Sequence, residues 1–113
     1  MLIQRHTGDR QVLRALFQEA DDSESAIDAY IDEGEILTAI DDDGEIVGHL
    51  QLIDCEGGTV ELKSMAVAAS RRGDGVGREL VAAAVRRCRE LPATRLLVAT
   101  AAADTGNLRF YQR

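Results

Sequence analysis

The residues that most constrain the fold of this chain are 71–78, which read Arg-Arg-Gly-Asp-Gly-Val-Gly-Arg. Three glycines and three arginines fall in this run, between a segment that alternates like a strand and one that has helical periodicity. Glycine lets a backbone adopt a positive φ and approach a ligand closely. The helix that follows adds unpaired N-terminal N–H groups and the positive end of its dipole. The run is therefore predicted to form an anion-binding loop, and phosphate is the anion that suits it best.

The segments on both sides of this loop are defined by their apolar patterns. Residues 59–67 alternate as a strand does and follow a Gly-Gly pair. Residues 76–91 have apolar side chains at helical spacing, and the single proline marks the end of that helix. The run 96–99 is continuously apolar, which is typical of a buried strand, and residues 107–111 are predicted to begin another helix. The apolar positions of the first of these helices are Leu80, Val81, Ala84, Val85 and Cys88.

The first half of the chain is predicted to complete the same sheet. A short strand at 2–5 precedes helices at 9–20 and 23–32, which begin at the capping residues Asp and Ser. Strands at 35–40 and 45–53 are joined by an Asp-Asp-Asp-Gly turn, which predicts a hairpin. The long strands up to residue 67 should be antiparallel, and the helical crossover should make the next strand parallel. The buried stripes of the two helices are predicted as Val12, Leu13, Leu16 and Phe17, and as Ala26, Ile27 and Tyr30.

These elements predict an α/β (α+β) fold with a mixed, mostly antiparallel central sheet flanked by helices. A chain of 113 residues with 45% hydrophobic residues is large enough for one core but not for two, so 1–113 is predicted to be a single domain. No signal peptide or membrane-spanning segment is expected, and the two cysteines lack metal-ligand spacing, which favours a cytoplasmic protein without a metal.

The glycine spacing distinguishes this loop from other phosphate-binding motifs. A P-loop would need Lys-Ser or Lys-Thr after the glycines, and a dinucleotide fingerprint would need Gly-x-Gly-x-x-Gly. Residues Arg72 to Gly77 instead fit Arg/Gln-x-x-Gly-x-Gly/Ala. This pattern resembles the acyl-CoA loop of the GNAT superfamily of N-acyltransferases, and the order of strand, loop, helix, strand and a helix with Asn and Tyr resembles a GNAT core. A plain glycine-rich turn before a helix is the structural alternative.

The resemblance implies an activity and a binding site. A GNAT protein moves an acetyl group from acetyl-CoA directly to a primary amine of a small molecule or a protein, without a covalent enzyme intermediate. The backbone of Met65, Ala66 and Val67 would bind the pantetheine arm and the thioester oxygen. The residues implied for the pyrophosphate are Arg72, Gly73, Asp74, Gly75, Val76, Gly77 and Arg78.

Two residues near the end of the chain match further GNAT roles. Tyr111 resembles the proton donor of the departing thiolate, a role that a phenol can fill. Packing against one helix face is its structural alternative, since Phe110 adjoins it. Asn107 resembles the residue that hydrogen-bonds the pantetheine arm, and a helix cap is an equal interpretation.

Glu61 is the candidate general base that would take a proton from the ammonium, directly or through water. By the strand period of two it shares a face with Lys63, Met65 and Val67. A cross-strand partner near Lys63 and a solvated residue at the strand edge are the alternatives for Glu61. His49 is a candidate for lining the acceptor pocket, although a lone strand histidine is more often structural.

Charge is divided unevenly along a chain whose formal net charge is −7. Residues 1–62 hold sixteen acidic residues against three arginines, and residues 63–113 hold ten basic residues against four acidic ones. A cationic second half suits the phosphates of coenzyme A, and an acidic first half would attract an amine. Composition bias is the alternative, because twelve of the thirteen basic residues are arginine. Nucleic acid is not expected as a partner, because most of this surface would repel a phosphate backbone.

The GNAT fold normally continues past the tyrosine with two more strands, and this sequence ends at Gln112 and Arg113. A shortened chain, a natural fragment and a protomer completed by a partner's strands in a homodimer are the alternatives. A noncatalytic acyl-CoA-binding module is therefore the alternative to an active enzyme, and a nucleotide-binding domain is a third hypothesis.

Overall fold

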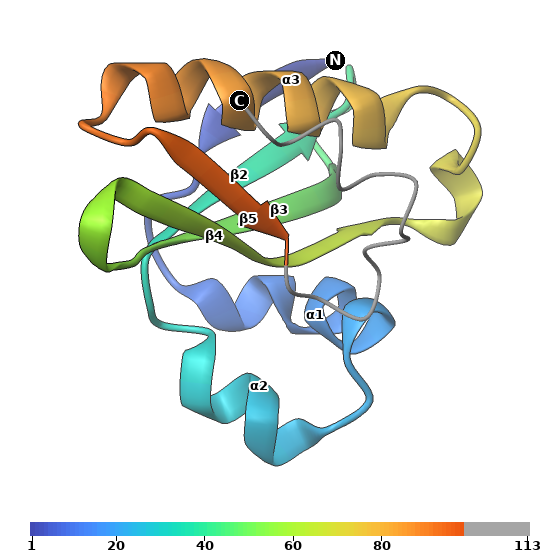
Figure 1. Cartoon of the computed structure of the whole chain (residues 1–113). Coiled ribbons are helices and arrows are strands. Elements are labelled where there is room, and N and C mark those ends of the chain that lie inside the picture. The colour runs from blue at the N-terminus through green and yellow to red at the C-terminus, as the bar shows by residue number, and fades with distance from the viewer. Residues whose placement is uncertain (99–113) are drawn as a thin grey trace.

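The computed structural model describes residues 1–98, whose strands form one sheet in the order β1-β2-β3-β4-β5 (Figure 1). Neighbouring strands are antiparallel from β1 to β4, and β5 is parallel to β4. The predicted mixed sheet is confirmed, including the parallel strand after a helical crossover. The strands are Leu2–Arg5 (β1), Glu35–Ile40 (β2), Ile46–Asp54 (β3), Thr59–Val67 (β4) and Arg95–Val98 (β5), and the helices are Arg14–Ala20 (α1), Glu24–Tyr30 (α2) and Val76–Glu90 (α3), with short 3-10 helices at Arg10–Leu13 (η1), Glu56–Gly58 (η2) and Ala69–Arg71 (η3).

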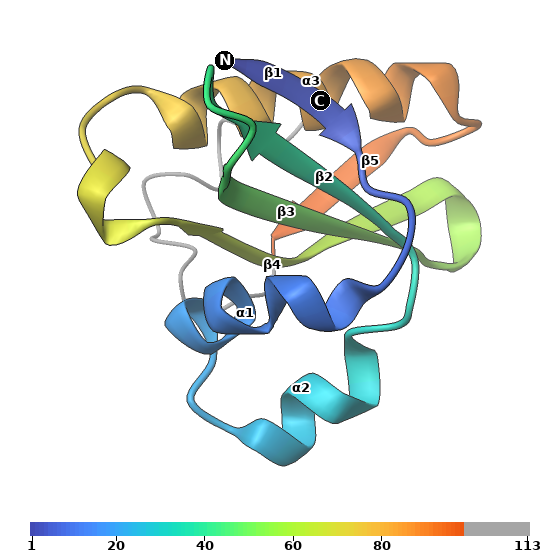
Figure 2. The ribbon, with the colours of Figure 1, turned by 180° about the vertical axis from the view of Figure 1, so that it is seen from behind.

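The sheet lies between two helical layers. The helix α3 covers one face, and α1 and α2 cover the other, as the two opposite views show (Figures 1 and 2). Each layer has its own apolar core. The core under α3 includes Leu50, Leu62 and Leu80, all at most 1% exposed. The core under α1 and α2 is built around Phe17 and Ile27, which are fully buried.

The predicted helix caps are present, but the first helix begins differently from the prediction. The carboxylate of Asp9 accepts a hydrogen bond from the N–H of Gln11 at 2.9 Å, and the Ser23 hydroxyl accepts one from Ala26 at 3.2 Å. The first turn after Asp9 is the 3-10 helix η1, not α-helix. The prediction that Val12 is buried is wrong, because this side chain is 64% exposed. A 3-10 turn has three residues per turn, which rotates Val12 away from the sheet.

The helix α3 packs closely on β3 because residue 48 of that strand is a glycine. A Cβ atom on Gly48 would lie 3.0 Å from Cγ1 of Val76 and 3.1 Å from Cδ1 of Leu80, so only glycine fits without adjustment. At the other end of α3, the guanidinium of Arg87 forms two hydrogen bonds of 2.9 Å with the carboxylate of Glu35 on β2. These contacts fix both ends of α3 against the sheet, and so fix where its N-terminus lies.

Two negative findings apply to residues 1–98. None of the helices there has the length and apolar character needed to cross a membrane. No three His, Cys, Asp or Glu side chains in this part of the chain gather in a way that could hold a metal ion.

Candidate functional site

The glycine-arginine segment forms the connection between β4 and α3. Gly73 and Gly75 have φ values of 90° and 84°, which the absence of a Cβ atom makes accessible. Gly75 is the N-cap of α3, and its carbonyl accepts the first helical hydrogen bond from the N–H of Glu79 at 3.0 Å. The N–H groups of Val76, Gly77 and Arg78 therefore have no acceptor within the helix. No side chain of the described residues caps α3, so these three donors are available to a ligand.

The residues that carry these donors line an open hollow. Its volume is about 600 Å³, and it is lined by Val67 and by every residue from Arg71 to Arg78. The structure thus brings the end of β4 together with the loop residues that the sequence predicted. Asn107 and Tyr111 lie outside the described residues.

The three arginines of the loop have different partners. The guanidinium of Arg71 lies 2.7 Å from the carboxylate of Asp41, and that of Arg72 lies 2.7 Å from the carboxylate of Glu19. Arg78 is exposed and forms no ion pair with any residue of 1–98. The sequence grouped these three cations together, but two of them are paired with carboxylates from distant segments. Of the three arginines, Arg78 is the one that can bind a ligand without first breaking an ion pair with a carboxylate of residues 1–98.

The strand β4 contains a bulge that corrects the predicted arrangement of its side chains. Gln51 pairs with Ser64 and Leu52 pairs with Leu62, so Lys63 is an extra residue on β4. The prediction that Glu61 and Lys63 share a face with Met65 and Val67 is wrong. Met65 and Val67 pack on the core under α3. The ammonium of Lys63 lies on the opposite face, 4.9 Å from the ring centre of Tyr30 on α2. An extra residue reverses the period of two, and a strand pattern alone does not show it.

Glu61 lies on the same face as Lys63. It pairs with Ile53, which packs on the core under α1 and α2, and on its other side with Leu97 of β5. Its backbone is about 13 Å along the strand from Met65, four residues at the usual rise. The structure therefore does not bring Glu61 together with the end of β4.

His49 is part of the core and not of the site surface. Its ring is fully buried, stacks on Phe17 with ring centres 4.3 Å apart, and contacts the Ser64 hydroxyl through Nε2 at 2.8 Å. Burial lowers the pKa of His49 from 6.5 to about 3, so the ring is neutral at physiological pH. This position agrees with the alternative that His49 has a structural role in the core and does not line an acceptor pocket. Ser64, which the sequence did not single out, directly follows the bulged Lys63, so the contact between His49 and Ser64 lies beside the bulge.

Comparisons with known proteins agree with this geometry. A family model described as the acetyltransferase (GNAT) family matches residues 6–113. The chain belongs to this family. The GNAT assignment predicted from the loop is confirmed, and the sheet and helix order is that of GNAT structures.

Relatives of this GNAT chain include proteins of known structure. It is 32% identical over 94 residues to YvbK of Bacillus subtilis, described as an uncharacterized N-acetyltransferase. That alignment covers 83% of this chain and 60% of YvbK, so the chain spans less than two thirds of that relative. A GNAT acetyltransferase from Elizabethkingia anophelis with acetyl-CoA bound has a TM-score of 0.82 and 28% identity, covering 96% of this chain and 71% of its own. A Bacillus subtilis acetyltransferase in complex with CoA has a TM-score of 0.80 and 29% identity, covering 95% and 70%.

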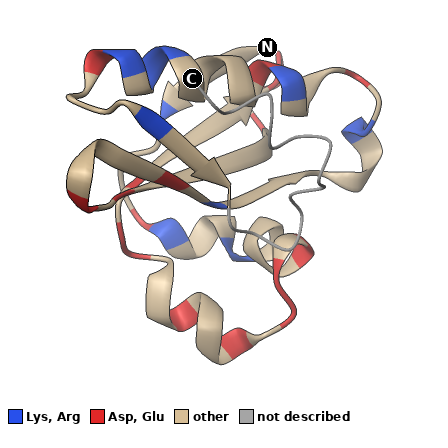
Figure 3. Cartoon of the chain, viewed as in Figure 1, with Lys and Arg blue, Asp and Glu red and all other residues tan. Residues whose placement is uncertain are grey.

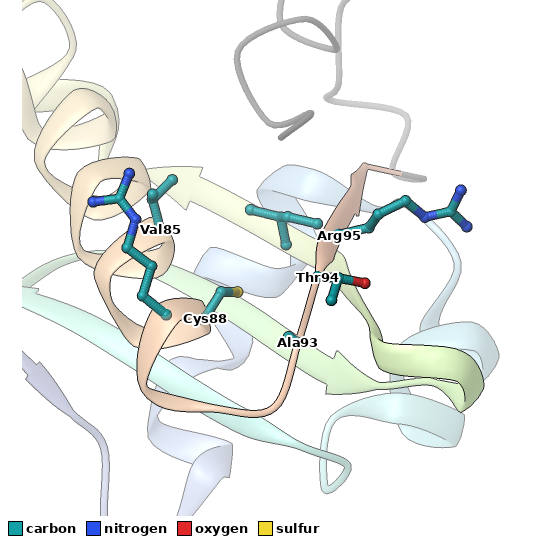
Figure 4. Close-up of a pocket in the computed structure, with 7 residues that line it drawn as sticks. Val85, Cys88, Ala93, Thr94 and Arg95 are labelled. Carbon is teal, nitrogen blue, oxygen red and sulfur yellow. The ribbon is translucent and has the colours of Figure 1, made fainter.

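A second hollow of this GNAT chain lies at the other end of α3, about 20 Å from the loop by the length of the helix (Figure 4). Val85 and Cys88 of α3 and Ala93 of the following turn line it. Arg95 contributes to its wall, but its guanidinium points away from the helix (Figure 4). The volume is about 110 Å³, far smaller than the hollow at the loop. Size and available donors both favour the loop as the functional site.

Proposed function

We propose that this chain binds acetyl-CoA at residues 71–78 and transfers the acetyl group directly to a primary amine of a small molecule or a protein. The observation that carries the proposal is the uncapped N-terminus of α3, whose first residues Val76, Gly77 and Arg78 line the hollow. Such a terminus favours a phosphate through both its N–H groups and the helix dipole. The relatives with bound acetyl-CoA and CoA support this choice of ligand.

The binding roles follow from the two segments that meet at the hollow. The pyrophosphate is assigned to the backbone of 73–78, with Arg72 and Arg78 as the cations. The pantetheine arm is assigned to the backbone of Met65, Ala66 and Val67 at the end of β4. The described part of β5 pairs only with Thr59–Leu62, at the start of β4. Residues 65–67, at the other end of β4, therefore lie beyond the described pairing with β5.

The transfer forms one bond, breaks another and moves two protons. The amine nitrogen forms a bond to the thioester carbon, and the carbon–sulfur bond breaks. N–H groups at the end of β4 are assigned to the charge that develops on the carbonyl oxygen. The attacking amine must lose a proton, and Glu61 is assigned this role through several bridging water molecules, because its backbone lies about 13 Å along the strand from Met65. Tyr111 is assigned the proton that the leaving thiolate takes up. Acidic residues lie on α2 and arginines lie on α3 (Figure 3). Acidic residues would attract a positively charged amine acceptor.

The first test is a calorimetric titration of the 113-residue chain with acetyl-CoA. Arg72→Ala and Gly75→Val should weaken binding, the second because a β-branched residue is strained at a φ of 84°. Gly77→Ala is the matched control, because its Cβ would meet Val67 at an ordinary 3.7 Å. A folded chain that does not bind acetyl-CoA at all contradicts the proposal.

A noncatalytic acyl-CoA-binding module is the second candidate, and the separation of Glu61 from the end of β4 favours it. Release of CoA thiol with a panel of amines separates the two functions. An enzyme should lose turnover in Tyr111→Phe and slow down in Glu61→Gln, with acetyl-CoA binding retained in both. A module would bind acetyl-CoA and release no thiol with any amine. A cytoplasmic location belongs to the same proposal.

A further inference from the structure

The β2–β3 turn and the phosphate-binding loop are joined by one side chain, that of Asp41. One oxygen of this carboxylate, Oδ1, accepts hydrogen bonds from the N–H groups of Asp43 at 3.0 Å and Glu45 at 2.9 Å. The other oxygen, Oδ2, accepts a hydrogen bond of 2.7 Å from Nη2 of Arg71. The side chain of Asp41 is only 9% exposed. A carboxylate at the end of β2 is thus held rigidly by its own turn and directed at the loop.

The partner, Arg71, is the last residue of η3, the short turn between the end of β4 and the glycine segment. Its N–H donates to the carbonyl of Ala68 at 2.9 Å, and its carbonyl accepts from the N–H of Asp74 at 3.2 Å. The N–H of Ala68 in turn donates to the carbonyl of Val47 on β3 at 2.8 Å. Arg71 therefore lies between a backbone fixed to the sheet and the start of the glycine segment.

The side chain of Arg71 is directed inward, and that of Arg72 outward. The side chain of Arg71 is 38% exposed and that of Arg72 is 61% exposed. Arg71 forms ion pairs with Asp41 at 2.7 Å and, more loosely, with the exposed Asp74 at 3.8 Å. Arg72 forms one with Glu19. The pair with Asp41 is the one supported by a nearly buried carboxylate with two further hydrogen bonds. Exposed pairs such as Arg72 with Glu19 are weak and exchange easily. The two neighbouring arginines are thus suited to different tasks.

We propose that Asp41 is a positioning residue for acyl-CoA binding, which acts through Arg71 to hold the loop in its ligand-binding conformation. This inference rests on the proposed function of the loop. Glycines at 73 and 75 give the loop many alternative conformations, and ordering them costs free energy on binding. A tether at the first residue of the loop reduces that cost by organising the loop in advance. Arg71 then supports the loop and does not contact the phosphates, which are left to Arg72, Arg78 and the backbone.

The test compares Asp41→Asn with Asp43→Asn. The asparagine oxygen can still accept from the turn N–H groups, but the charge that faces Arg71 is lost. Asp43→Asn makes the same change of net charge in the same turn and leaves the pair with Arg71 intact. The dissociation constant for CoA, measured by calorimetry, should rise roughly 5- to 10-fold in Asp41→Asn and stay unchanged in Asp43→Asn. With an amine that supports turnover, KM for acetyl-CoA should rise and KM for the amine should not.

A double-mutant cycle with Arg71→Gln separates positioning from direct contact. If Arg71 acts only through Asp41, the double variant Asp41→Asn/Arg71→Gln binds CoA no more weakly than either single variant. Losses that multiply in the double variant overturn the proposal, because Arg71 would then contact the ligand itself.

Two controls keep the outcomes distinct. A wild-type chain that does not bind CoA contradicts the proposed function, whereas a wild type and an Asp41→Asn variant that bind equally contradict only the role of Asp41. If Asp41→Asn does not unfold cooperatively, Arg71→Gln alone decides, since it leaves the hydrogen bonds of the turn in place. Unchanged CoA affinity in Arg71→Gln would also overturn the proposal.

Discussion

Acid should destabilise this fold through one buried imidazole, that of His49. The folded protein keeps the pKa of His49 near 3, because the ring is buried against Phe17, whereas the unfolded chain has the ordinary value of 6.5. Below pH 6.5 the unfolded state therefore takes up a proton that the folded state does not. The stability is complete above pH 6.5 and is lost as the pH falls.

The size of this effect follows from the two pKa values. Between pH 7.5 and pH 5.0 the free energy of unfolding should fall by about 2 kcal/mol through His49 alone. The loss then approaches about 1.4 kcal/mol for each further pH unit until the pKa of the folded state is reached. An effect of this size is a large part of the stability of a small domain.

Urea unfolding at pH 7.5 and pH 5.0 measures this difference in the wild type, His49→Gln and His6→Gln. His49→Gln will be less stable at both pH values, since it loses the stacking on Phe17, so only the pH-dependent difference is compared. That difference should shrink by about 2 kcal/mol in His49→Gln, and His6→Gln is the matched replacement of a histidine elsewhere in the chain. Carboxylates contribute equally to all three chains and cancel. Equal pH dependence in the wild type and His49→Gln, or an imidazole of the folded protein that titrates near pH 6.5 at position 49 in NMR spectra, would refute the reasoning.

Three further predictions concern the placement of α3. Gly48→Ala should lower the free energy of unfolding by about 1–3 kcal/mol, because its Cβ would lie 3.0 Å from Val76; urea unfolding at pH 7 that shows no loss would mean that α3 shifts freely. Gly75→Val should weaken acetyl-CoA binding in calorimetry while Gly77→Ala preserves it, and equal affinities would show that the left-handed N-cap is not needed. Arg87→Gln should destabilise the fold at pH 7 more than at pH 3, because Arg87 lowers the pKa of Glu35 and that contribution is lost as Glu35 is protonated. Equal losses of urea midpoint at the two pH values would argue against the ion pair.

Local sequence signals predicted much of this structure correctly. The bounds of β2 and β4 coincide with the alternating runs 35–40 and 59–67, since each run is bounded by turn-forming residues. Ser23 caps α2 as its position before an apolar stripe predicts. Two of the three loop glycines, Gly73 and Gly75, have the positive φ values that a glycine-rich turn predicts. These features depend on neighbours in the chain, which a sequence displays directly.

The features that the sequence did not predict depend on residues far apart. The pairs Arg71 with Asp41 and Arg72 with Glu19 join residues 30 and 53 positions apart, and no local pattern indicates which carboxylate a given arginine will meet. The bulge at Lys63 depends on the register between two strands. The bulge places Glu61 on the face of the sheet opposite to Met65 and Val67. The candidate base is therefore the site residue whose position the sequence predicted least well.

The choice of basic residues in this chain, with one lysine among twelve arginines, also has a chemical consequence. Thioesters acylate exposed amines without a catalyst, so a chain that binds one is exposed to modification of its own surface. Lys63 is the single lysine in this sequence, and its ammonium lies against an aromatic face. Every other basic side chain that carries charge at neutral pH is an arginine, whose guanidinium keeps its proton and is a poor nucleophile. The arginine-rich composition therefore leaves the protein with few amines that a thioester bound to it could acylate.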